Sequence, residues 1–315
     1  MAALRSLTET LVGHPGNAAL RDAESLFELG GPPGYYNAAA KAALLRGNGR
    51  PPYDELQVDF HERDSRLAVR AGGSTLAEGV WGWQTTVQGE SLTAAGEWEE
   101  SCWYRDKECD YLEIELRLSG GWRLERQMLL VRKERFLFLA DAVLGPSPDA
   151  SEIRHVSSLP MASRIEWLPA SETREGWLRG APDGRRTVIA PALPEWRSEH
   201  AHSALTAEGG QLSLSQMGLG CNLYVPLWID LDPVRSRKPL TWRKLTVGEG
   251  LETVARDVAV AYRIQAAASQ WLFYRSLAPR RNRTFLGENY SSEFACCRFL
   301  PTGAGEEIIS VEATQ

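Results

Sequence analysis

Two histidines separated by one residue are the first group in this sequence whose spacing could support chemistry. His200 and His202 would place their side chains on one face of an extended segment, because strand side chains repeat every two residues. Two imidazoles on one face can hold zinc when a third ligand, such as Glu195 or Glu199, completes the site. A polar surface loop is the more ordinary interpretation of the same residues. The sequence therefore predicts no metal site and no cofactor, with this pair as the alternative.

Tryptophan is concentrated in one part of the chain. All eleven tryptophans lie between Trp81 and Trp271. Trp81, Trp83, Trp98 and Trp103 could stack on sugar rings, whose apolar faces suit flat aromatic surfaces, and the first two share a face of an extended segment. The same side chains could instead fill the space between two wide sheets. These four residues are the predicted carbohydrate-binding set.

Charge and motifs exclude several function classes. Thirty-five basic and forty-one acidic residues give a net charge of −6, which lacks the basic field that drives nucleic-acid binding. The sequence contains no glycine-rich phosphate loop, no Gly-x-Ser-x-Gly motif and no His-Glu-x-x-His motif. Arg280, Arg281 and Arg283 could contact an acidic saccharide, although a solvated loop is the more ordinary interpretation. No nucleic-acid partner is predicted.

The apolar segments and cysteines bear on location. No run approaches the roughly 18 apolar residues that a membrane-spanning helix requires. The first residues, MAALRSLTETLVGHPG, lack a long apolar segment, so we expect no signal peptide, no membrane partner and, by default, a cytoplasmic location. The five cysteines form no Cys-x-x-Cys pair and are predicted to be mostly reduced, with a Cys102–Cys109 bridge left open.

Hydrophobic periodicity divides the chain near residue 50. Apolar residues recur at three- and four-residue steps before Gly30, and Ala38–Leu45 could form one more helix. We therefore expect a short helical N-terminal segment over residues 1–50. Beyond it the period changes to two, most clearly where Leu112, Ile114 and Leu116 alternate with glutamates. The predicted fold class is mainly β, with one large antiparallel multi-stranded β-sandwich over residues 51–315 whose sheets are solvated on one face.

Three stretches between Gly96 and Gly145 form a recognisable succession. They read Gly96-Glu-Trp-Glu-Glu-Ser-Cys-Trp-Tyr-Arg, Trp122-Arg-Leu-Glu-Arg-Gln-Met-Leu-Leu-Val and Phe136-Leu-Phe-Leu-Ala-Asp-Ala-Val-Leu-Gly. This succession resembles the C-terminal β-sandwich of the heparinase II/III-like polysaccharide lyases. There, a strand with an arginine before an apolar run precedes a strand ending in "aspartate, any residue, valine". Arg126 and Asp141 take those places here, and His155 lies where family members often carry a histidine.

The resemblance implies a fold and a conditional activity. These lyases join an α/α toroid of several hundred residues to this sandwich, and they cleave uronic-acid polysaccharides by β-elimination, with tyrosine and histidine as base and acid. This sequence departs from that pattern in two ways. Only about 50 residues of helical texture precede the strands, and the place of the family's His-Asn-Thr signature reads Tyr35-Tyr36-Asn37, without a histidine. The toroid and the catalytic groups it carries are therefore expected to be missing.

Three functions remain open at this level. The leading hypothesis is a non-catalytic saccharide-recognising or accessory module, with a polysaccharide ligand and a protein partner. The second is an active polysaccharide lyase or other carbohydrate enzyme with a site on the sandwich, for which His155, Arg126 and Tyr104 are the catalytic candidates. The third is a purely structural or protein-interaction domain. Arg126 and Asp141 could equally be a buried pair that fixes two strands.

Overall fold

The computed structural model describes residues 34–47 and 51–312. Within these ranges the regular structure is almost entirely β-strand, and the helical elements are two 3-10 turns, η2 (Ser119–Gly121) and η3 (Arg235–Arg237). Neighbouring strands pair in antiparallel fashion throughout the named ladders. The prediction of a mainly β fold built from antiparallel sheets is confirmed.

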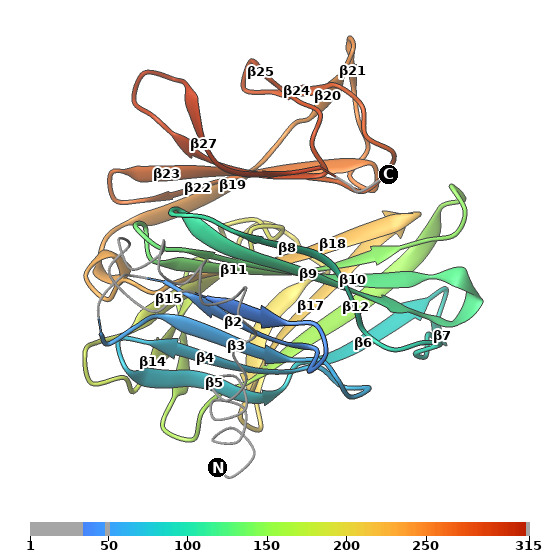
Figure 1. Cartoon of the computed structure of the whole chain (residues 1–315). Coiled ribbons are helices and arrows are strands. Elements are labelled where there is room, and N and C mark those ends of the chain that lie inside the picture. Colours follow the sequence, from blue (N-terminus) through green and yellow to red (C-terminus); the bar gives the residue numbers. More distant parts are fainter. Residues whose placement is uncertain (1–33, 48–50, 313–315) are drawn as a thin grey trace, which may run out of the picture.

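An eight-stranded central sheet runs through the middle of the molecule (Figure 1). Its strands in spatial order are β13 (Glu166–Pro169), β14 (Gly176–Arg179), β15 (Arg186–Ile189), β18 (Asn222–Asp230), β11 (Phe136–Leu144), β10 (Arg123–Val131), β9 (Cys109–Arg117) and β8 (Glu99–Arg105). The glycine-rich turn η2 joins β9 to β10.

Two five-stranded sheets cover one face of the central sheet. The first comprises β1 (Tyr35–Asn37), β2 (Ala42–Arg46), β3 (Glu55–Asp59), β4 (Arg66–Ala71) and β5 (Ser74–Val80). The second comprises β16 (Ala204–Glu208), β17 (Gln211–Gly220), β12 (Ser151–Pro160), β6 (Gly82–Val87) and β7 (Glu90–Ser91). Their apolar side chains and those of the central sheet form the inner core, which includes Leu56, Leu112, Leu124, Leu139 and Leu214.

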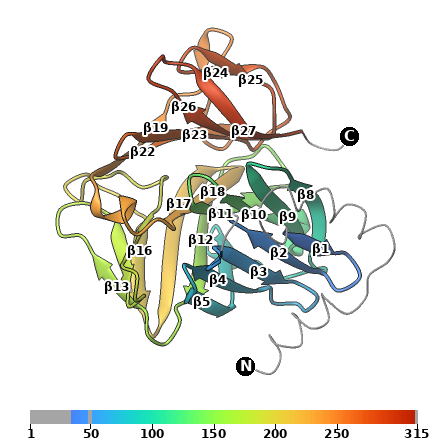
Figure 2. The ribbon, with the colours of Figure 1, turned by 60° about the vertical axis from the view of Figure 1, so that its left-hand side comes forward.

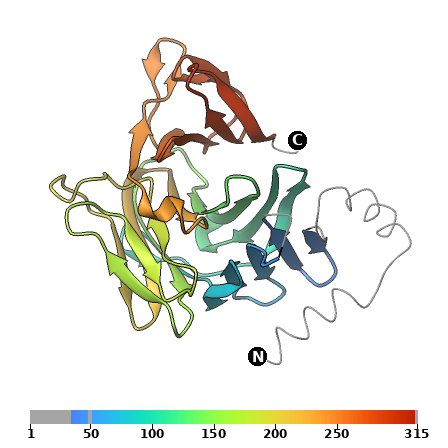
Figure 3. The ribbon, with the colours of Figure 1, turned by 90° about the vertical axis from the view of Figure 1, so that its left-hand side faces the viewer.

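The C-terminal part of the chain forms a further layer over the opposite face, coloured orange to red in Figures 1, 2 and 3. One sheet contains β19 (Leu240–Leu245), β22 (Ala259–Ala266), β23 (Ser269–Ser276), β26 (Phe294–Phe299) and β27 (Gly305–Val311). A four-stranded sheet of β21 (Glu252–Thr253), β20 (Gly248–Glu249), β24 (Arg283–Phe285) and β25 (Glu288–Tyr290) lies beyond it.

The central sheet is therefore buried on both faces, and successive side chains enter different cores. Leu112 and Leu124 point into the inner core. Leu129 and Phe138 point the other way, into an outer core beneath the C-terminal layer, where the Phe138 and Phe273 rings stack 4.5 Å apart. The expectation of sheets with one solvated face is wrong for this sheet. The reason is that the C-terminal layer covers the second face. The alternation of polar and apolar residues along one strand does not indicate whether such a covering layer exists.

The N-terminal expectation is partly wrong. Instead of a helix over Ala38–Leu45, the chain makes a turn and then strand β2, which pairs with β3 in register Leu45↔Leu56. Both leucines are fully buried, so packing against the sheet overrides the weak helical spacing. The helices expected before residue 34 lie outside the described residues. The division into residues 1–50 and 51–315 stays a prediction, although strands already begin at Tyr35.

The cysteines are not joined by disulfide bonds in the structure. All five cysteines are free thiols, so the Cys102–Cys109 bridge is not formed. Burial raises the pKa of Cys102 to about 11 and moves the pKa of Cys109 further in the same direction. Within residues 34–47 and 51–312, no helix is long and apolar enough to cross a membrane.

Candidate functional site

Arg126 is held at the centre of the inner core by several acceptors. Its Nε donates to Asp141 Oδ1 at 2.9 Å, directly across the β10–β11 pair. Its Nη1 donates to Ser65 Oγ and to the Trp81 carbonyl oxygen, each at 2.6 Å, and its Nη2 donates to the Gly82 carbonyl at 3.3 Å. The predicted pair of Arg126 and Asp141 is thus formed and buried, and it ties two strands to the segment that precedes β6.

Two of the predicted carbohydrate-binding tryptophans enclose this arginine. The guanidinium carbon of Arg126 lies 4.2 Å from the Trp81 ring centroid and 5.0 Å from that of Trp98, and the two indoles are only 2% and 0% exposed. Their Nε1 groups donate to Ser157 Oγ and to the Arg63 carbonyl oxygen. Neither indole offers a face to a sugar ring, because both serve the core. For Trp81 and Trp98 the saccharide-platform prediction is wrong.

The other two tryptophans of the set are less enclosed. Trp83 and Trp103 are half-buried and pack against the inner core from its margin. The Trp103 ring lies 5.8 Å from the Tyr36 ring in a tilted arrangement. A saccharide-binding role for Trp83 and Trp103 stays a prediction.

His155 belongs to the same buried network as Arg126. Its Nε2 lies 2.9 Å from Asp141 Oδ2, and its Nδ1 lies 2.8 Å from Thr85 Oγ1. Burial by itself would raise the pKa of Asp141, but the charge of Arg126 and the hydrogen bond from His155 hold it at about 2. The carboxylate therefore stays ionised between two cationic or donating partners. Arg126, Asp141 and His155 are all fully buried.

Tyr104, the third catalytic candidate, lies elsewhere. It is 42% exposed on edge strand β8, and its hydroxyl donates to Asp106 Oδ2 at 3.2 Å. Partial burial and then the charge of Asp106 raise its pKa above the usual tyrosine value, which is the wrong direction for a general base. Tyr104 is at the surface while Arg126 and His155 are fully enclosed. The three candidates do not converge in one cleft, which is the correction to that prediction.

The exposed histidine pair does come together. His200 Nε2 lies 3.2 Å from His202 Nε2, and the rings meet edge to face. The suggested third ligand, Glu195, is occupied, because its carboxylate accepts hydrogen bonds from Thr241 and Arg243. Among the residues that the structure describes, no His, Cys, Asp or Glu joins this pair in a group of three potential metal ligands. The structure thus supplies two of the ligands that zinc needs.

A groove of about 600 Å³ opens where the C-terminal layer meets one end of the central sheet. The ends of β10, β11 and β18 form one side, and the segment that follows β23 forms the other. Its charged lining residues are Arg123, Arg280 and Glu293. The amide of Asn222 fixes the two sides together, because Nδ2 donates to the Leu277 carbonyl at 3.0 Å. The groove therefore combines apolar walls with three charged side chains, and this hydrogen bond joins its two sides.

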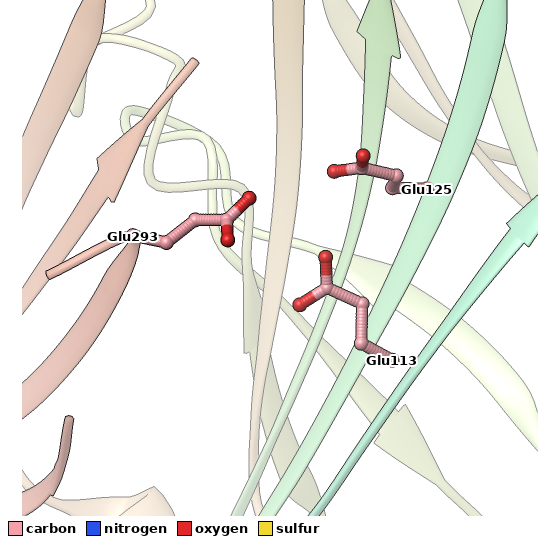
Figure 4. A group of neighbouring side chains, drawn as sticks. All are labelled: Glu113, Glu125 and Glu293. Atoms are coloured by element: carbon pink, nitrogen blue, oxygen red, sulfur yellow. The ribbon is translucent and has the colours of Figure 1, made fainter. Parts of the chain in front are cut away.

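The carboxylate of Glu293 and two buried carboxylates, those of Glu113 and Glu125, converge on the guanidinium of Arg275. This group of four residues is called the Arg275 cluster. Arg275 Nη2 donates to Glu113 Oε1 and lies beside Glu293 Oε1, at 3.1 Å in each case, and it also donates to Glu125. The carboxylate oxygens lie within 4.8 Å of one another. Figure 4 shows Glu293 pointing from the C-terminal layer toward the two glutamates of the central sheet.

Each glutamate of the cluster has a different set of partners. Glu113 also accepts hydrogen bonds from the Tyr111 hydroxyl and from Gln127 Nε2, whose amide oxygen accepts from the Tyr224 hydroxyl at 2.6 Å. Burial opposes ionisation of Glu113, but the Arg275 charge and these donors lower its pKa. Glu125 has Arg275 without the other donors. Burial raises the pKa of Glu125, the charge of Arg275 lowers it, and repulsion from Glu113 raises it again. The result is a pKa of about 7.

The sequence did not point to this cluster. Glu113 alternates with apolar residues, which predicts a solvated face for its side chain. The sequence does contain one weak signal, because an arginine directly after the apolar run Trp271-Leu-Phe-Tyr needs an anionic partner if the strand is buried. The partners could not be named, since Arg275 and Glu113 are 162 positions apart.

Comparison with known proteins addresses the fold. No family model matches the sequence, and no curated protein matches it. Among solved structures, the heparan sulfate lyase HepC from Pedobacter heparinus superposes with a TM-score of 0.51 and 10% identity, over 79% of this chain and 43% of that one. The heparinase III BT4657 gene product with methylated lysines gives 0.50 and 9%, over 78% and 42%. The fold is heparinase-like.

The heparinase-like fold accounts for most of the described chain. It confirms the heparinase-like fold expected from the succession around Arg126 and Asp141. At this identity the likeness concerns the fold alone. This heparinase-like chain spans less than half the length of the lyases that it matches.

Proposed function

We propose that this protein is a non-catalytic module that binds an acidic polysaccharide in the groove between the central sheet and the C-terminal layer. The observation that carries the proposal is the recess itself, of about 600 Å³, with Arg123 and Arg280 among its lining residues. A recess of this size accommodates a few sugar residues. The heparinase-like fold supports a polysaccharide as the ligand class, since the relatives of known structure are named for heparan sulfate lyase activity.

The two arginines favour an anionic ligand. The Arg123 side chain is 48% exposed, and its Nη1 lies 2.6 Å from Glu115. Arg280 is 29% exposed, and its partner Glu312 is 3.7 Å away and mostly solvated. Exposed pairs of this kind contribute little, so either arginine can exchange its carboxylate for one on a ligand. Arginine also matches carboxylate and sulfate oxygens in a two-point geometry.

The positions of the catalytic candidates support a binding role over catalysis. β-Elimination needs a base that reaches the proton beside the uronate carboxyl. Arg126 and His155 are enclosed in the inner core, and Tyr104 lies apart from them at the surface. The groove holds none of these three residues. A saccharide bound there meets arginines and one carboxylate, Glu293, rather than a tyrosine and histidine pair.

Calorimetric titration with a heparan sulfate decasaccharide, and with a neutral maltooligosaccharide of the same length, tests the proposal. We expect saturable binding of the acidic chain and none of the neutral one. Arg280→Ala should weaken binding about two- to fivefold, the value of one exposed ionic contact. Arg179→Ala, which breaks an exposed pair between β14 and Glu166 on β13 at the far edge of the sheet, is the matched control and should leave the Kd unchanged.

Ultraviolet absorbance followed in the same samples distinguishes binding from cleavage. A lyase would release unsaturated uronate and the absorbance would rise, which would overturn the non-catalytic part of the proposal. Flat absorbance with saturable, arginine-dependent heat supports it. Equal affinity for both saccharides, or binding that Arg280→Ala leaves intact, would remove the groove as the site.

A further inference from the structure

Glu293 is common to the groove and to the Arg275 cluster. It lines the recess, and its side chain is one-quarter exposed there. Its Oε1 lies 3.1 Å from Arg275 Nη2, the same nitrogen that serves Glu113 and Glu125. A ligand in the groove would therefore lie next to a carboxylate that shares its counter-charge, Arg275, with two buried carboxylates.

The charges of the cluster do not balance when every group is ionised. Three carboxylates surround one guanidinium, and the nearest second cation, Arg123 Nη1, lies 3.5 Å from Glu125 Oε1. The titratable and charged groups that face the Arg275 cluster from β8, β9, β10 and the segment after β23 are Cys102, Tyr111, Glu115, Arg123 and Arg280. Of the two further cations, Arg123 contacts Glu115 and Arg280 lies 3.7 Å from Glu312. One proton relieves the excess negative charge.

The partners within the cluster assign that proton. Glu113 accepts from Tyr111 and Gln127 as well as from Arg275, so it is the glutamate best stabilised as an anion. Glu125 has fewer donors and is almost fully enclosed. Burial raises its pKa to about 7, and burial also raises the pKa of Glu293. The cluster consequently changes charge near neutral pH, with Glu125 as the principal proton carrier.

We infer that binding of an acidic saccharide in the groove is coupled to proton uptake by the Arg275 cluster, so that affinity rises as the pH falls from about 8 to about 6. The inference rests on the proposed function. A negative ligand beside Glu293 adds repulsion to the ionised cluster and favours its protonated form. By linkage, protonation strengthens ligand binding to the same extent. Protonation of Glu125 also removes the more distant of the two carboxylates that face Arg123 Nη1 and leaves Glu115 as its anionic partner.

Titration of the heparan sulfate decasaccharide at about pH 6 and about pH 8 tests the coupling. The ligand's own carboxylates and sulfates stay ionised over this range. We expect roughly fivefold tighter binding at the lower pH. Calorimetry at about pH 7 in two buffers of different ionisation enthalpy should show net proton uptake on binding. In the free protein, carbon-13 NMR of labelled glutamate side chains should give a Glu125 midpoint between about 6 and 8.

Two variants locate the coupling. Glu125→Gln resembles the protonated state, so it should bind at pH 8 as the unmodified protein binds at pH 6, with the pH dependence lost. Glu293→Gln, which is less buried and less prone to disturb folding, should reduce the dependence in the same direction. Glu166→Gln changes an exposed glutamate on β13, outside the groove lining, and should retain the full pH dependence.

The outcomes separate the two proposals. Binding with the same Kd at both pH values, or a Glu125 midpoint below about 5, overturns the coupling and leaves the binding function standing. Failure to bind the acidic saccharide at every pH overturns the binding function and the coupling with it. Proton uptake that persists unchanged in both Glu125→Gln and Glu293→Gln would place the proton outside the Arg275 cluster.

Discussion

Arg275→Ala is expected to lower the free energy of unfolding by about 3–5 kcal/mol at about pH 8, the cost of leaving buried carboxylates without their cation. Arg275 is 1% exposed and contacts Glu113, Glu125 and Glu293. These contacts join the C-terminal layer to the central sheet. The substitution removes the guanidinium from all three at once. Urea denaturation followed by circular dichroism would measure the loss.

The deficit of Arg275→Ala should shrink as the solution is acidified. Without the guanidinium, the folded-state pKa of Glu113 changes from lowered to raised relative to the unfolded chain, and the pKa of Glu125, which is already raised, rises further. Groups with a raised folded pKa bind protons preferentially in the folded state, so stability increases as the pH falls through those values. The variant should therefore be closer to the unmodified protein at about pH 5.5 than at about pH 8. Adding Glu113→Gln and Glu125→Gln to Arg275→Ala should restore part of the stability. A small loss, equal at both pH values, would contradict this account.

Arg126→Ala is expected to have an effect of similar size, about 3–5 kcal/mol, for a different network. It leaves Asp141 enclosed in the inner core with His155 as its remaining hydrogen-bond partner. It also empties the space between the Trp81 and Trp98 rings. The acceptors that now bind the guanidinium, such as the Trp81 carbonyl oxygen, lose their hydrogen-bond donor. Arg154→Ala, which breaks an exposed pair with Glu152, is the matched control and should leave the urea midpoint almost unchanged.

The pH signature of the Arg126 network runs opposite to that of the Arg275 cluster. The pKa of Asp141, which burial alone would raise, is held at about 2 by Arg126 and His155, below its ordinary value. A group with a depressed folded pKa contributes stability above its unfolded pKa, and that contribution is lost as the pH falls through the folded value. The stabilisation from Asp141 should thus be complete above about pH 5 and disappear toward pH 2. An Arg126→Ala variant with an unchanged melt would remove this network as a determinant of stability.

The fold class was predictable because many strands show the same alternation of polar and apolar residues. The leucines of β9 and the succession around Arg126 and Asp141 were enough to predict the antiparallel sheets and the heparinase-like resemblance. The pairing of Arg126 with Asp141 was also accessible, since both lie in apolar runs where an unpaired charge is costly. Local sequence patterns of this kind therefore predict the structure correctly.

The rest depended on contacts that a local pattern does not contain. Glu113 has the sequence appearance of a surface residue, and it is buried because the C-terminal layer lies over it. Trp81 and Trp98 have the appearance of sugar platforms, and they became core residues because Arg126 occupies the space between them. The segment before Arg46 has helical spacing, but β3 offers it a sheet edge. In each case a partner distant in sequence decides the outcome.

The separation of 162 positions between Glu113 and Arg275 also matters while the chain is being made. Domains tend to fold from the N-terminus during synthesis. When β9 and β10 leave the ribosome, their glutamates and the aromatic side chains beside them have no covering layer, and they must remain hydrated until β23 is synthesised. A nascent chain stalled before Arg275 would expose Tyr111, Leu129 and Phe138 to any neighbouring chain. Ribosome pausing late in the message would thus favour aggregation over native assembly.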